Sequence, residues 1–208
     1  MSIYKMTLND YLALVASKSP TPGGGSVSAV AAANAAAMVS MVANLTLKKK
    51  GYEAVQPQVE EILEGATQAI EKLKDLTSQD MQVFENLMTA WRLPSENDDQ
   101  KEIRTEALEK AAQEASAVPL EICQVCLKIL KLADDLAPIG NKNAISDVGV
   151  GAYLAEASLK AAMLNVDINL PSIKDETLRL HLISEKERLL REAEELKTLA
   201  MEKVRARL

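Results

Sequence analysis

The chain has 208 residues, of which 48% are apolar and only 3% aromatic, and its formal net charge is −6. This length suits one domain spanning residues 1–208, and a core of aliphatic side chains and alanine favours helices over sheets. The negative charge, without interleaved basic and aromatic residues, argues against nucleic-acid binding. The first residues do not read as a charged and then apolar leader with a cleavage site, so we expect a cytoplasmic protein.

A short helix is predicted at about Thr7–Ser17, where Thr7 can cap the first turn. The loop Pro20–Ser26 follows, and its two prolines restrict the backbone while its three glycines let another group approach the main chain closely. Ser26 is the predicted N-cap of the next helix. The start of that helix leaves N–H groups unpaired, which suits an anion or a polarised oxygen. The loop is either a tight connection into a close-packed helix or part of a binding site.

An alanine-rich run from Val27 to Leu47 predicts a long helix. The run is long enough to span a membrane, but its two serines and two asparagines favour a buried helix of a protein that does not bind membranes. If Asn44 is buried, it needs a hydrogen-bond partner from a ligand or a second subunit. Lys48–Lys50 follow the helix, where three cations either complement the helix dipole or attract an anionic substrate tail.

The third predicted helix starts near Pro57 and carries apolar side chains at helical spacing as far as Trp91. Asp80 lies in its latter half, one turn before Phe84. Judged by position alone, Asp80 is either a solvated surface residue or a carboxyl group against an apolar stripe, where burial would raise its pKa.

A fourth helix is predicted from about Gln100, and Pro119 is expected to kink or break it near residues 117–118. Cys123 and Cys126 lie in its apolar second half. The chain has one His and no second Cys pair, so we interpret these two residues as core cysteines rather than as a zinc or redox pair.

A second polar loop, residues 140–147, leads into another alanine-rich helix, for which Ser146 and Asp147 are natural caps. Residues 165–171 alternate polar and apolar side chains and are predicted to be an extended connection. A final helix from Ser172 is expected to pair with the other long helix as an antiparallel hairpin. The predicted fold class is all-α, a multihelical array with no sheet.

Several of these features occur together, and in this order, in one family. The shared stretches are Ser19–Ser26, Met41–Thr46, Asp80 with Phe84, Leu93-Pro94, Val118–Leu120, Gly140-Asn141, Ser146-Asp147 and Asn165–Leu170. Over almost its whole length the chain resembles the cyclodeaminase domain of formiminotransferase-cyclodeaminase and its stand-alone bacterial relatives, some of which are described as methenyltetrahydrofolate cyclohydrolases.

The resemblance implies an all-helical homodimer that acts on a tetrahydrofolate carrying a one-carbon unit at N5. In the cyclodeaminase reaction N10 attacks the formimino carbon, ammonia leaves, and a 5,10-methenyl bridge remains; a cyclohydrolase would instead add water to that bridge. No metal or redox cofactor is implied. By match, Asp80 falls on the acid to which the family assigns proton transfer. A non-catalytic helical dimer is the alternative from another class.

Around Asp80, the glycine loop is expected to receive a carboxylate or the carbonyl edge of the pterin. Asn141, Ser146 and Asp147 are expected to orient the ring system, with Asp147 pairing with the guanidine-like N–H edge of the pterin. Lys48–Lys50 are expected to attract the glutamate tail. Asp80, the glycine loop and the Ser146-Asp147 step are expected to face one shared cavity. The predicted substrate-binding residues are Pro22, Gly23, Gly24, Gly25, Ser26, Asn44, Lys48, Asn141, Ser146 and Asp147.

Overall fold

The computed structural model describes residues 3–208, and these form α-helices and short 3₁₀ turns without a strand. The prediction of an all-α fold is confirmed. The α-helices are α1 (Leu8–Val15), α2 (Gly24–Thr46), α3 (Gln56–Trp91), α4 (Asp98–Leu136), α5 (Ile145–Asn169) and α6 (Glu176–Arg205); the 3₁₀ turns are η1 (Ile3–Lys5), η2 (Glu53–Val55), η3 (Lys142–Ala144) and η4 (Leu170–Ser172).

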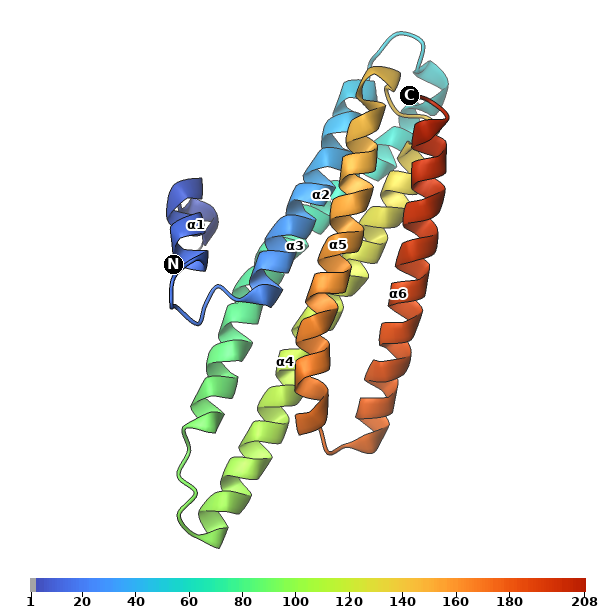
Figure 1. The fold of residues 1–208 in the computed structure, drawn as a ribbon. Coiled ribbons are helices and arrows are strands. Elements are labelled where there is room, and N and C mark those ends of the chain that lie inside the picture. Colours follow the sequence, from blue (N-terminus) through green and yellow to red (C-terminus); the bar gives the residue numbers. More distant parts are fainter. Residues whose placement is uncertain (1–2) are drawn as a thin grey trace.

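The helices α2 to α6 form an elongated bundle, with α2 and α5 side by side at its centre (Figure 1). Helix α2 packs against α3 and α5, and α4 packs against α3, α5 and α6. The short α1 lies at one side of the bundle (Figure 1), where Tyr4 just before it is hydrogen-bonded to Thr77 of α3 at 3.0 Å. Thr7 caps α1, because its hydroxyl oxygen accepts a hydrogen bond from the Asp10 N–H, as predicted.

The long antiparallel hairpin consists of α3 and α4, which extend together beyond the other helices (Figure 1). The predicted pairing of the third and last helices is therefore wrong, since α6 packs against α4 and α5. The short turn after Trp91 makes α3 and α4 neighbours, and the equally short η4 connection returns α6 alongside α5.

Small side chains let α2 and α5 approach each other closely. A Cβ atom on Gly151 would lie 3.1 Å from the Ala35 carbonyl oxygen, so a larger residue there would push the two helices apart. By length and composition α2 could cross a membrane, but 61% of its most apolar segment is buried inside the bundle. Cys123 and Cys126 are fully buried free thiols, and burial raises the pKa of Cys123 to about 12; their interpretation as core residues is confirmed.

The observed helix starts correct three predicted caps. Helix α2 begins at Gly24 with Gly23 as its N-cap, so Ser26 lies inside the first turn, where its hydroxyl donates to the Gly23 carbonyl oxygen. Helix α5 begins at Ile145, so neither Ser146 nor Asp147 caps it. The preceding η3 turn carries the backbone directly into α5, which leaves no extended residue for a side-chain cap.

Two predicted breaks between helical segments are absent. Helix α4 runs through the buried Pro119 without the break expected near residues 117–118. Helix α5 continues through the predicted extended connection to Asn169, because the apolar residues of this stretch pack at helical rather than alternating spacing. The final helix accordingly starts later than predicted, with the Asp175 side chain capping it through the Leu178 N–H.

Candidate active site

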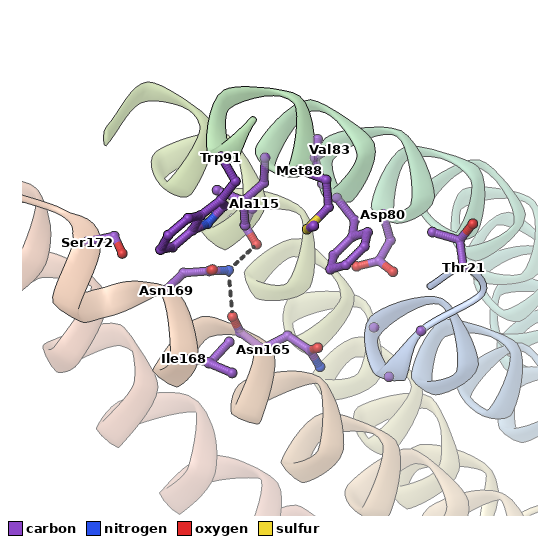
Figure 2. A pocket seen from close by; sticks show the side chains of 15 residues that line it. Thr21, Asp80, Val83, Met88, Trp91, Ala115, Asn165, Ile168, Asn169 and Ser172 are labelled. Carbon is purple, nitrogen blue, oxygen red and sulfur yellow. Dashed lines mark hydrogen bonds between the residues drawn. The ribbon is translucent and has the colours of Figure 1, made fainter. Parts of the chain in front are cut away.

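A cavity of about 380 Å³ lies where the start of α2, the latter half of α3 and the end of α5 meet (Figure 2). One wall is the apolar stripe of α3, which ends at Trp91, and the opposite wall is the last turn of α5 with η4. The Arg104 guanidinium lies 5.5 Å from the centre of the Trp91 ring and supports this wall from α4. The lining residues are Thr21, Gly23, Gly24, Gly25, Asp80, Val83, Phe84, Leu87, Met88, Trp91, Ala115, Asn165, Ile168, Asn169 and Ser172.

Asp80 projects from α3 onto the first turn of α2 (Figure 2). Its carboxylate lies so close to Gly25 that a Cβ atom on Gly25 would be only 2.0 Å from Oδ1. Only glycine leaves room for this approach, which explains one of the three glycines of the loop. The structure thus brings two predicted features, the glycine loop and Asp80, into one cavity.

Opposing effects act on the pKa of Asp80. Burial is the larger effect, and it raises the pKa above the ordinary aspartate value. The N–H and hydroxyl groups of Ser26, which is fully buried beside the carboxylate, favour the charged form and partly offset the effect of burial. Asp80 is therefore a carboxyl group that can hold or release a proton near the apolar wall of the cavity.

The start of α2 presents unpaired backbone donors to the same space. The first intrahelical bond runs from the Val27 N–H to the Gly23 carbonyl oxygen, so the N–H groups of Gly24, Gly25 and Ser26 have no backbone acceptor. No side chain among residues 3–208 accepts a hydrogen bond from Gly24 or Gly25 either. Since the Ser26 N–H already faces the Asp80 carboxylate, the N–H groups of Gly24 and Gly25 are the ones that can bind a carbonyl oxygen or an anion, as the sequence predicts for this loop.

Asn165 and Asn169 complete the polar part of the cavity and were missed as site residues. Asn169 Nδ2 donates to the Asn165 carbonyl oxygen at 2.8 Å and to the Ala115 carbonyl oxygen at 3.0 Å (Figure 2). The Ala115 oxygen is available because Pro119, four residues later, has no N–H to donate to it. Both asparagines belong to the stretch Asn165–Leu170 shared with the family, which was the signal that could have identified them.

The other predicted site residues lie at the opposite end of the bundle. Asn141 uses its side chain within the fold, because Nδ2 donates to the Leu45 carbonyl oxygen at 3.0 Å and Oδ1 accepts from Lys49 Nζ at 3.0 Å. Lys48 follows α2 directly, with an unusual positive φ of 57°. None of the residues Asn44, Lys48, Asn141, Ser146 and Asp147 lines the cavity that contains Asp80.

Within one chain, the expected meeting of Asp80, the glycine loop and the Ser146-Asp147 step therefore occurs only for the first two. Ser146 and Asp147 lie in the first turn of α5, whereas the cavity is formed by its last turns. Asn44 Nδ2 donates to the Ser40 carbonyl oxygen of its own helix, and the exposed side chain can form its other hydrogen bonds with solvent, so no ligand is required there.

Taken together, the cavity suits a flat molecule with apolar faces and a polar edge, placed beside a carboxyl group that can transfer a proton. Among residues 3–208, no three His, Cys, Asp or Glu side chains come close enough to hold a metal ion. The class of protein defined by this fold and site is a helical small-molecule enzyme with a partly buried carboxyl group in its cavity.

Comparison with known proteins gives the family. The sequence profile of formiminotransferase-cyclodeaminase matches residues 7–188. Methenyltetrahydrofolate cyclohydrolase of Methylorubrum extorquens is 37% identical over 201 residues, covering 97% of both chains. Formimidoyltransferase-cyclodeaminase of Sus scrofa is 30% identical over 206 residues, which are 99% of this chain but 38% of the pig protein.

A solved structure agrees with these relatives. Formiminotetrahydrofolate cyclodeaminase of Thermotoga maritima superposes with a TM-score of 0.89 at 36% identity, covering 98% of each chain. The chain belongs to the formiminotransferase-cyclodeaminase family, an enzyme family, and the resemblance drawn from its sequence motifs is confirmed.

Proposed function

We propose that the protein is a formimidoyltetrahydrofolate cyclodeaminase, which closes 5-formimino-tetrahydrofolate to 5,10-methenyl-tetrahydrofolate and releases ammonia. The observation that carries this proposal is the position of Asp80, a partly buried carboxyl group between the apolar wall of α3 and the free N–H groups of α2. The relative of solved structure with this activity in its name, from Thermotoga maritima, matches the chain over its whole length.

Asp80 can serve both proton transfers of this reaction. As N10 attacks the formimino carbon, a new C–N bond forms and the Asp80 carboxylate takes the proton from N10. The resulting carboxylic acid then gives this proton to the amino nitrogen, the bond between that nitrogen and carbon breaks, and ammonia leaves. A second proton, taken up from solvent by the imine nitrogen, gives the methenyl bridge its positive charge. A raised pKa suits the acid half of this cycle, because a carboxyl group that holds its proton nearer neutral pH is available to donate it.

The walls of the cavity supply orientation. The apolar side chains of α3, with Trp91 at their end, can cover the faces of the pterin and benzoyl rings, and the α2 N–H groups can bind the pterin carbonyl oxygen. Excluding water from the formimino carbon favours attack by N10 over hydrolysis. The residues present need no metal or redox group for these steps, and we expect none.

Methenyltetrahydrofolate cyclohydrolase is the second candidate function. It is favoured by the relative of that name in Methylorubrum extorquens, which matches this chain over nearly the full length of both proteins. In this reaction water adds to the methenyl carbon and Asp80 takes one proton from it. The resulting carboxylic acid gives this proton to the nitrogen whose bond to that carbon breaks, and the remaining hydroxyl proton is released to solvent as the formyl C=O forms on the other nitrogen. The same cavity serves both reactions, since only the nucleophile and the group that leaves differ.

We also propose a homodimer that acts in the cytoplasm. Exposed apolar side chains on the neighbouring helices α2 and α5 support an interface there: Met41, Leu45, Val150 and Tyr153. The two free thiols suit a reducing compartment. Light scattering of the purified protein at several concentrations measures the assembly, and a monomer at all of them would contradict the proposed dimer.

Supplying each folate separately to the purified protein tests the function. With 5-formimino-tetrahydrofolate, the proposal predicts a rise in methenyl absorbance and an equal release of ammonia. With 5,10-methenyl-tetrahydrofolate, a fall in methenyl absorbance faster than the uncatalysed rate, without ammonia, would identify the cyclohydrolase. Activity on neither folate would contradict both proposals and leave a non-catalytic helical dimer.

A further inference from the structure

The carboxamide groups of Asn165 and Asn169 have fixed orientations, because their N–H groups are already used. Asn165 Nδ2 lies 3.2 Å from the Ala161 carbonyl oxygen and 3.4 Å from that of Ala162, while Asn169 Nδ2 donates to Ala115 and Asn165. Carbonyl oxygens only accept hydrogen bonds, so each amide nitrogen must face them. Within residues 3–208, neither Oδ1 accepts a hydrogen bond, and both residues line the cavity (Figure 2).

The two Oδ1 acceptors lie next to the N–H donors at the start of α2, so donors and acceptors follow one another along the cavity. Asn165 Oδ1 lies 3.4 Å from the position that a Cβ atom on Gly24 would take, so it flanks the free N–H groups of the α2 start. Asn169 lies one helical turn further, about 6 Å along α5. The protein therefore offers a donor, an acceptor and a second acceptor in this order along one side of the cavity.

This row complements the pyrimidine edge of a reduced pterin, which carries the C4 carbonyl oxygen, the N3–H group and the 2-amino group in sequence. We propose that the α2 N–H groups bind the C4 oxygen, Asn165 Oδ1 accepts from N3–H, and Asn169 Oδ1 accepts from the 2-amino group. Asn165 and Asn169 are thus specificity-determining residues for the pterin, an inference that rests on the proposed folate substrate.

The proposed orientation of the pterin agrees with the position of the Asp80 carboxyl group. In a pterin, N5 is adjacent to the C4 carbonyl, so binding C4 oxygen at the start of α2 places N5 near Gly25, where the Asp80 carboxylate lies. The one-carbon unit on N5 then comes next to the group proposed to transfer protons. The Asp147 carboxylate, expected from the sequence to bind this pterin edge, is at the far end of α5 from the cavity.

Ligand pairs with and without the 2-amino group test the assignment. Trp91 is the single tryptophan of the chain and lines the cavity, so quenching of its fluorescence measures binding of 5-formyl-tetrahydrofolate and of its 2-desamino-2-methyl analogue. The parent protein should bind the analogue about 10-fold more weakly, because one hydrogen bond is lost and Asn169 Oδ1 stays unpaired. The Asn169→Ala variant should bind the two ligands with affinities within about threefold of each other.

Asn165→Ala removes no side-chain hydrogen bond between helices, so we expect this variant to fold like the parent protein. It should weaken binding of both ligands by about 10-fold while keeping the preference between them. Asn34→Ala is the matched control: its side chain donates to the Val30 carbonyl oxygen of its own helix and does not line the cavity, so affinity and preference should be unchanged.

Three results would each overturn the assignment. The first is equal binding of both ligands by the parent protein, the second is a preference of Asn169→Ala for 5-formyl-tetrahydrofolate as strong as that of the parent, and the third is binding by Asn165→Ala with the affinity of the parent. A purely structural role of Asn169, as a tether between α5 and α4, would lower the melting temperature but leave the discrimination intact. If the parent protein turns over a tetrahydrofolate without discriminating against the analogue, only this inference fails. If it neither binds nor converts tetrahydrofolates, the proposed function fails as well.

Discussion

At Asp80, burial outweighs the favourable groups of Ser26 and raises the carboxyl pKa in the folded state. In the unfolded chain the same group titrates near its ordinary pKa of about 4. The folded state therefore keeps its proton to higher pH, and the free energy of unfolding falls as pH rises from the unfolded to the folded pKa. Asp80→Asn should remove this contribution, so that the variant gains stability over the parent as pH rises through this window. Urea unfolding at a series of pH values measures the difference, and a constant difference would contradict the raised pKa.

Gly25 matters because the Asp80 carboxylate occupies the place of a side chain. Gly25→Ala would set a methyl group 2.0 Å from the present position of Oδ1, so the carboxylate must move away from the α2 N–H groups. We expect turnover to fall by about 10-fold or more, since the acid is displaced from the reacting atoms. Gly65→Ala is the control, because Gly65 lies outside the cavity and its methyl group would meet only the flexible end of the Leu132 side chain, at 3.2 Å. Steady-state kinetics on both variants measures the effect, and equal activities would refute this role of Gly25.

Much of the site at this scale was visible in the sequence. The Pro/Gly loop and the family motif at Asp80 are local signals. Gly23, Gly24 and Gly25 line the cavity with Asp80, whereas Pro22 and Ser26 do not. The acceptors Asn165 and Asn169 were not predicted as site residues, because their stretch alternates polar and apolar side chains and was read as extended. Its continuation as helix depends on packing against α4, which a local pattern does not contain.

At the scale of the helix, Pro119 is a positioning residue for the site. Without an N–H it leaves the Ala115 carbonyl oxygen free, and Asn169 Nδ2 binds there at 3.0 Å. Pro119→Ala would restore a backbone N–H that competes for this oxygen, so the Asn169 side chain should lose its fixed orientation. We expect folate affinity to fall by roughly threefold or more while the protein stays at least as stable, since proline is unfavourable inside a helix.

Titration of Trp91 fluorescence and thermal unfolding measure the two effects of Pro119→Ala. Pro57→Ala is the matched control, because Pro57 lies in the first turn of α3, where no helical N–H bond is missing and where the residue is outside the cavity. Unchanged folate affinity in Pro119→Ala would show that the proline does not position Asn169.

Helical spacing of apolar residues, alanine-rich runs and capping residues together predicted the existence of each α-helix, whereas the ends and partners of the helices depend on contacts distant in sequence. Asp80 shows this limit of prediction from local sequence. The sequence pattern predicts the helix that carries Asp80, but the surroundings of its carboxylate depend on α2, which is distant in sequence. The pairing of α3 with α4 instead of α6 likewise follows from the connections and from which apolar faces meet.

At the scale of the molecule, the polar residues predicted as site residues lie at two opposite ends of the bundle. At the end away from the cavity, Asn141 joins the end of α2 to the loop before α5 through its side chain and through its N–H, which donates to Thr46 Oγ1 at 2.8 Å. Asn141→Ala should lower the free energy of unfolding by about 1 kcal/mol, because the buried Asn141 side chain loses its hydrogen bonds to the Leu45 carbonyl oxygen and to Lys49. Exposed Asn143→Ala is the control in urea unfolding, and equal stabilities of the two variants would contradict this structural role.

The proposed reaction depends most on proton transfer by Asp80, and turnover of the Asp80→Asn variant tests this role most directly. The substitution keeps the shape of the side chain but replaces the ionisable carboxyl group by an amide, which cannot take up and release a proton near neutral pH. With the folate that the parent converts, the turnover rate should fall by about 10²–10⁴-fold, while the dissociation constant from Trp91 fluorescence changes only a few-fold. Asp75→Asn, an exposed residue of the same helix, should behave as the parent. Near-normal turnover in Asp80→Asn would contradict the central claim.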